Sequence, residues 1–169
     1  MSDFSVMTPD WNQIPQIEVI GQVVIEGTHA IIPTSEGNLT LTLSKKGARL
    51  RIGKRIFHDY KMIKRLPENL ALSLSNQSDK TEITTDNLKF VLYHSPFSFK
   101  FYKANKLIQS SATDGHFVRR YRLPPLAKVD QAWFMSFELD SSEPVYGLGE
   151  KWGKLDKRGQ LVRSFNHDA

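Results

Sequence analysis

The chain contains no cysteine, so disulfide bonds and cysteine-based metal sites are excluded. The lack of cysteine also favours an intracellular protein, and we expect this one to be cytoplasmic. It also lacks long apolar runs, since no stretch approaches the roughly 20 residues that span a bilayer; we therefore expect no membrane partner. The N-terminus, MSDFSVMTPDW, has neither the basic nor the apolar segment of a secretory signal peptide. Segments with helical periodicity are scarce, and none is long enough for a βαβ crossover.

Short stretches in which apolar and polar residues alternate are abundant. Leucine occupies every second position from 39 to 43 and again from 70 to 74, with threonine, serine or alanine between. Two apolar rows flank the break at His94-Ser95-Pro96, one formed by Leu88, Phe90 and Leu92 and the other by Phe97, Phe99 and Phe101. A period of two is typical of strands with one buried face. The two rows therefore predict neighbouring antiparallel strands that meet in the core.

About ten such strands, separated by turn residues, predict an all-β protein with an antiparallel β-sandwich or barrel. We divide the chain into an irregular lead-in (1–15), a β-sandwich (16–145) and a glycine-rich loop segment (146–169). Less regular stretches carry further expectations. These are a strand over 17–25 bent at Gly21, a turn at Gly37-Asn38, a helical turn over 60–66, a strand over 117–123 and a strand over 133–139 buried on both faces.

Basic residues are concentrated between positions 45 and 65, although the net charge of the chain is only +5. The window contains Lys45, Lys46, Arg49, Arg51, Lys54, Arg55, Lys61, Lys64 and Arg65, opposed only by Asp59. One interpretation is a surface for an anionic partner. The favoured one is the solvated face of edge strands, where basic residues discourage pairing with other chains. Only Phe57 and Tyr60 are aromatic in this window, which lacks a series of aromatics interleaved with the basic residues as stacking platforms and matches no nucleic-acid-binding motif, so we expect no nucleic-acid partner.

Several kinds of chemistry do not fit the motifs. Gly147 and Gly149 suggest a dinucleotide loop, but the third glycine position is occupied by Trp152 and no long helix follows. The five histidines (His29, His58, His94, His116 and His167) stand far apart, so we expect neither a metal site nor a cofactor. The carboxylates near the C-terminus are Glu138, Asp140, Glu143, Glu150, Asp156 and Asp168. The sequence gives no reason to pair any two of them as a catalytic dyad.

The segment from Tyr146 to Ala169, YGLGEKWGKLDKRGQLVRSFNHDA, closely resembles a long and specific motif of family 31 glycoside hydrolases, which include α-glucosidases and α-xylosidases. Upstream, SPFSFKFYKANKLIQSS is similar to the family's proline-phenylalanine strand and the hairpin after it, although the hairpin glycine is missing here. The resemblance implies a galactose-mutarotase-like β-sandwich that precedes a (β/α)₈ barrel. In that family the barrel supplies both catalytic aspartates of a retaining mechanism, and we therefore expect no catalytic residue in this chain.

The resemblance also implies roles for individual residues. Asp168 corresponds to a family aspartate that contacts substrate hydroxyls, and Phe165 stands where many members have tryptophan. Four further residues, Tyr146, Gly147, Gly149 and Glu150, are expected to hold the loop and its contact with the barrel. The implied partners are an oligosaccharide or α-glycoside, bound by the whole enzyme, and the barrel itself. The oligomeric state stays open.

Two other functions remain open from the sequence. A free-standing carbohydrate-binding or mutarotase-like β-sandwich would have the same fold, but a mutarotase needs convergent histidine and glutamate side chains that the sequence does not identify. An anion-binding surface over residues 45 to 65 is the third possibility.

Overall fold

The computed structural model describes residues 13–45, 47–53, 69–112, 117–118, 121–122, 124–130, 132–147 and 154–159. The helical turn expected over 60–66 lies outside these ranges. The chain divides into two compact units, Met1–Glu138 and Leu139–Ala169. Each unit is described by itself below.

The first sheet of the larger unit has four antiparallel strands in sequence order: β1 (Val24–Glu26), β2 (His29–Thr34), β3 (Gly37–Ser44) and β4 (Gly47–Ile52). The leucine row of β3 is buried, as its alternation predicts. The turn expected at Gly37-Asn38 falls instead at residues 35–36. Gly37 is the first residue of β3 and has a φ of +107°, a conformation that favours glycine. The glycine therefore follows the turn directly instead of lying within it.

The second sheet has five antiparallel strands, again in sequence order: β5 (Ser73–Asn76), β6 (Lys80–Thr84), β7 (Leu88–Tyr93), β8 (Ser98–Lys103) and β9 (Lys106–Ser110). In the β7–β8 register, Phe90 lies opposite Phe101 and Leu92 opposite Phe99. The two predicted apolar rows therefore meet, which confirms their pairing. Ala104 and Asn105 form the β8–β9 turn with positive φ at both residues, as a tight two-residue hairpin requires.

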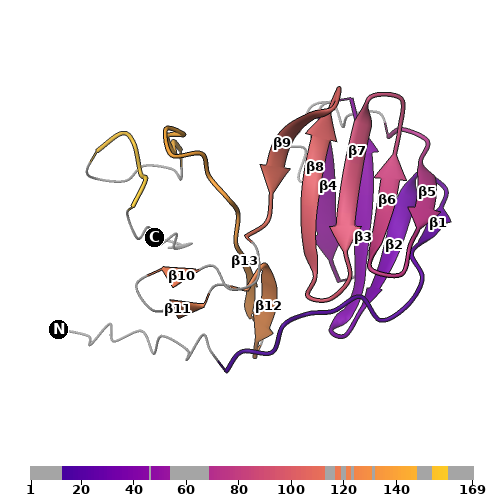
Figure 1. The fold of residues 1–169 in the computed structure, drawn as a ribbon, viewed down its shortest axis with the longest axis horizontal. Coiled ribbons are helices and arrows are strands. Elements are labelled where there is room, and N and C mark those ends of the chain that lie inside the picture. Colours follow the sequence, from indigo (N-terminus) through magenta and orange to yellow (C-terminus); the bar gives the residue numbers. More distant parts are fainter. Residues whose placement is uncertain are drawn as a thin grey trace, which may run out of the picture. The chain divides into compact units, whose positions relative to one another are not determined.

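The two sheets form two layers in Figure 1, and their facing side chains make one hydrophobic core. Its fully buried members include Ile32, Leu41, Ile83, Leu92 and Phe97, which come from both sheets or from the turn between β7 and β8. This arrangement confirms the predicted antiparallel β-sandwich. Among the described residues, no helix is long and apolar enough to cross a membrane.

The segment before β1 connects the two layers instead of forming one long strand. The Ile20 amide donates a hydrogen bond to the Pro33 carbonyl in β2, whereas the Val19 amide donates to the His94 carbonyl just after β7. Because its amides alternate between partners on different sheets, the segment cannot build a regular ladder. The regular strand β1, Val24–Glu26, includes only the last two residues of the expected strand over 17–25.

Two hairpins replace long strands expected near the end of the larger unit. Residues 117–122 contain β10 (Phe117–Val118) and β11 (Tyr121–Arg122), which pair with each other, so the single strand expected over 117–123 is wrong. The second hairpin pairs β12 (Leu126–Val129) with β13 (Ala132–Met135).

The expectation of a strand over 133–139 buried on both faces is also wrong. The regular strand ends at Met135, and Phe137 and Leu139 are 50% and 43% exposed. Only a short bridge continues it, because Phe137 pairs with Ser111 just beyond the end of β9. Phe137 therefore extends the edge of the five-stranded sheet by one bridge and remains half exposed.

Candidate functional site

The residues that the family motif singles out are described only in part. Asp168, Phe165, Gly149 and Glu150 lie outside the described ranges. The side chain of Tyr146 is 60% exposed. Gly147 has a φ of +97°, and an added Cβ would meet no atom within 4 Å, so backbone conformation and not crowding favours glycine there. Tyr146 and Gly147 thus lie on an open loop, and their roles stay predictions.

Arg158 organises the described part of the smaller unit. Its Nη1 donates hydrogen bonds to the backbone carbonyls of Asp140 and Glu143, at 2.7 and 2.6 Å. One guanidinium nitrogen thus holds both ends of the turn at residues 140–143. Arginine has several donors in a planar, always charged group, which suits it to bridging carbonyls. Within the described residues, Arg158 is thus bound to its own loop.

Asp156 fixes the other side of the same unit. Its Oδ1 accepts hydrogen bonds from the backbone amides of Val145 and Arg158, both at 2.9 Å. The Lys157 amide donates to the Val145 carbonyl at 2.7 Å, which ties the two segments a second time. The bonds from Val145 and then Arg158 hold the pKa of Asp156 below its ordinary value of 3.8.

Asp140 has a similar structural use. Its Oδ1 accepts from the backbone amide and the hydroxyl of Ser142, at 3.0 and 2.8 Å, and these bonds lower the pKa of Asp140. A carboxyl group that acts as a general acid has a raised pKa, the opposite of what is found here. Two of the acids considered for catalysis therefore serve as ionised acceptors that hold turns.

The hydrogen bonds of Asp156 with the Val145 and Arg158 amides are expected to weaken at acidic pH. The pKa of Asp156 in the folded chain lies below the unfolded value of 3.8. The stabilisation of the folded segment by ionised Asp156 is therefore fully present above the unfolded pKa, and it is lost as the pH falls through the lower folded pKa. The Val145 amide resonance, followed by NMR from neutral pH to about pH 2, should shift in that acidic range. Asp156→Asn keeps an acceptor oxygen but does not titrate, so its Val145 resonance should lack this transition. A wild-type resonance that stays constant would contradict the assignment.

A polar pocket of about 460 Å³ lies beside His94 in the larger unit. Asn76 Nδ2 donates to the Val23 carbonyl, which leaves Asn76 Oδ1 to accept the Thr81 hydroxyl at 2.8 Å. The Thr81 hydroxyl also lies 3.0 Å from His94 Nε2, and His94 Nδ1 lies 3.3 Å from the Ser78 carbonyl oxygen. His94 is thus held in a hydrogen-bond network, and no carboxylate is among the residues lining this pocket. The histidine–glutamate pair of a mutarotase is not found there.

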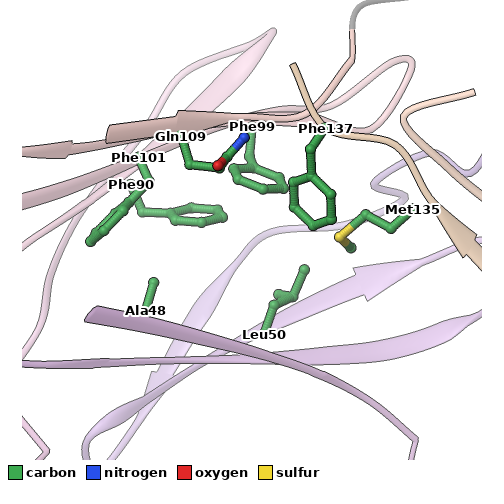
Figure 2. A pocket seen from close by; sticks show the side chains of 8 residues that line it. All are labelled: Ala48, Leu50, Phe90, Phe99, Phe101, Gln109, Met135 and Phe137. Atoms are coloured by element: carbon green, nitrogen blue, oxygen red, sulfur yellow. The ribbon is translucent and has the colours of Figure 1, made fainter. Parts of the chain in front are cut away.

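A second pocket, of about 300 Å³, lies between the two sheets and is mainly apolar (Figure 2). Phenylalanine side chains from β7 and β8 form one wall, and β4 forms the other. Among the described residues that line it, Gln109 has the only polar side chain. Neither His94 nor Gln109 was singled out as a site residue from the sequence, because the partners that give each its position are distant in the chain.

The basic window is described only in part. Arg49 and Arg51 lie on β4, which is an edge strand of the first sheet. This position agrees with the edge-strand interpretation of the window. Within the described residues, no cluster of histidine and carboxylate side chains is suited to hold a metal ion.

Comparison with known proteins bears on the fold and the loop together. A search of curated proteins found no match. The model of one protein family, described as the glycosyl hydrolase 31 N-terminal galactose mutarotase-like domain, matches residues 38–169. The match covers most of the sandwich strands and runs through the whole C-terminal motif. Because it spans well over half of the chain, the protein belongs to the family of glycosyl hydrolase 31 N-terminal galactose mutarotase-like domains.

Proposed function

We propose that this chain is the N-terminal β-sandwich domain of a retaining α-glycosidase that hydrolyses α-glucosidic or α-xylosidic bonds. The family match over residues 38–169 carries the proposal, because it extends through the motif that resembles the active-site loop of these enzymes. The domain shapes the substrate pocket and packs on a catalytic (β/α)₈ barrel that lies outside this chain. In barrel enzymes the catalytic residues lie at the C-terminal ends of the barrel strands.

The described part of the chain supports the proposal that the barrel, and not this domain, carries the catalytic groups. A retaining glycosidase needs two carboxyl groups about 5–5.5 Å apart, one of which has a raised pKa. Asp140 and Asp156 instead have lowered pKa values and accept hydrogen bonds within their own turns. Hydrolysis of this kind requires no cofactor, and the absence of cysteine suits a cytoplasmic enzyme.

The C-terminal loop is proposed to reach the substrate. Asp168 accepts hydrogen bonds from sugar hydroxyls, since bonds to an ionised acceptor are the stronger kind. Phe165 offers an aromatic face beside it. Tyr146, Gly147, Gly149 and Glu150 shape the backbone that leads there. Arg158 and Asp156 stiffen the start of this unit, which limits the conformational entropy lost when the loop meets a ligand.

A free-standing carbohydrate-binding protein is the alternative, and the polar pocket beside His94 favours it. Amide and hydroxyl groups line this pocket, as in many sites for uncharged polar ligands. No phenylalanine, tyrosine or tryptophan is among its described lining residues, however, so the pocket lacks the large ring on which a sugar face usually stacks.

Calorimetric titration separates the two functions. Glucose, xylose and maltose should give no heat of binding with the chain alone, because an open polar pocket without a stacking ring or carboxylate binds sugars too weakly. Saturable binding that is lost in His94→Ala would instead support the alternative. His29→Ala is the matched control, since His29 contacts Thr42 on the other sheet and does not line the pocket.

A further inference from the structure

The apolar pocket is open at one edge of the sandwich. Ala48 and Leu50 of β4 face Phe90, Phe99 and Phe101 across it (Figure 2). The three phenylalanines are at most 8% exposed, whereas Ala48 is exposed and Phe137 is 50% exposed. The rings therefore form a buried wall, and the exposed residues lie where the pocket opens.

A β-bulge explains why a glutamine lies among these rings. In the β8–β9 register Phe101 is opposite Gln109, but Tyr102 is opposite Leu107, so Ile108 is the extra residue. The bulge keeps Gln109 on the face of Phe101, toward the pocket, and leaves Leu107 and Ile108 exposed. Bulges often redirect a side chain beside a functional site.

The orientation of the Gln109 amide is fixed by the backbone. Its Nε2 donates hydrogen bonds to the carbonyls of Glu138 at 2.8 Å and Ser110 at 3.1 Å. Carbonyl oxygens accept only, so the amide cannot be flipped without losing both bonds. Within the part of the chain described here, Oε1 receives no hydrogen bond, and Figure 2 shows it on the pocket side of the amide. The pocket thus contains one oriented acceptor.

The surrounding rings favour an aromatic ligand. Phe90 and Phe99 stack with centroids 4.9 Å apart, and Phe137 meets the Phe99 ring edge-on at 6.1 Å. Another ring placed in the pocket extends this cluster in the geometries that aromatic pairs prefer. An apolar cavity of roughly 150 Å³ is enough to bind benzene. The volume of about 300 Å³ here leaves room for two fused rings.

We propose that this pocket binds a small fused-ring aromatic molecule whose single hydrogen-bond donor is directed at Gln109 Oε1. The rings supply the apolar contact, and the amide oxygen selects ligands that have an N–H or O–H group. This site is separate from the proposed glycosidase function and does not depend on it.

Indole and 1-methylindole test the proposal with the unmodified chain. The two ligands share the fused rings, but only indole has an N–H. In NMR titrations we expect indole to bind about three- to tenfold more tightly, as one net hydrogen bond allows. Gln109→Leu should bind both with equal affinity. The proposal would be overturned if neither ligand bound, or if both bound the unmodified chain with equal affinity. Neither ligand would bind if another segment or a second copy of the chain already filled the pocket.

Blocking the pocket provides the second test. Ala48→Phe places a ring at the opening, where the native residue is exposed, and should abolish binding of both indoles. Arg49→Phe is the matched control, because successive residues of β4 face opposite sides of the sheet. It should bind as the unmodified chain does. Circular dichroism and thermal unfolding confirm that each variant is folded. Undiminished binding by a folded Ala48→Phe variant would place the ligand elsewhere.

Discussion

Replacing Phe97 by alanine is expected to lower the free energy of unfolding by about 3–5 kcal/mol, the usual range for removal of a buried aromatic side chain. Phe97 is completely buried, in the turn between β7 and β8, and belongs to the core that both sheets share. Its backbone amide donates to the Ile17 carbonyl at 2.8 Å, and alanine keeps that bond. The decrease in the free energy of unfolding therefore comes from the side chain alone, because its burial is lost and a cavity is left behind.

Urea unfolding followed by circular dichroism measures this change, and the midpoint should fall by roughly 2 M. Leu107→Ala is the control, because it also removes an apolar side chain, but one that is 46% exposed at the sheet edge. Leu107→Ala should lower the free energy of unfolding by only about 0.5 kcal/mol. Similar losses in the two variants would contradict the position of Phe97 in the shared core.

The sandwich core follows from local pattern in the sequence. The leucines of β3 and the two rows that flank residues 94–96 are buried because period-two alternation directs every second side chain to one face. The pairing of β7 with β8 also follows, since only a short turn separates the rows. These features depend on residues that are close in sequence, and so they were predictable.

The features that sequence analysis missed depend on distant partners. Residues 17–25 look like one strand, but the amides of Val19 and Ile20 donate to partners on different sheets. The bulge at Ile108 changes which side chains face inward, so alternation gave no reason to place Gln109 among phenylalanines. Arg158 bridges carbonyls 15 and 18 residues earlier in the chain. Spacing along the chain does not show such contacts.

The functional conclusion came from a different kind of signal. The motif from Tyr146 to Ala169 identified the family without any knowledge of the fold, and the family match confirms it. The roles of Asp168 and Phe165 rest on the motif alone and stay predictions. The structure adds that the loop before them is held by Arg158 and Asp156, which no motif indicated.

The chain alone is expected to have no glycosidase activity. Enzymes accelerate their reactions by at least about 10⁶-fold, and most of that rate depends on correctly placed catalytic groups. The proposed catalytic aspartates lie on a barrel outside this chain, and Asp140 and Asp156 are ionised acceptors in turns. A longer polypeptide that continues into the barrel should therefore hydrolyse an α-glycoside that the chain alone leaves intact.

The most direct measurement is the release of 4-nitrophenol from 4-nitrophenyl α-glucoside and α-xyloside, with the chain alone and the longer polypeptide assayed side by side. We predict a rate equal to the enzyme-free rate for the chain alone, and turnover of at least one substrate by the longer polypeptide. Turnover by the chain alone would contradict the conclusion that catalysis lies outside it, and a folded longer polypeptide that hydrolyses neither substrate would contradict the proposed hydrolysis of α-glucosidic or α-xylosidic bonds.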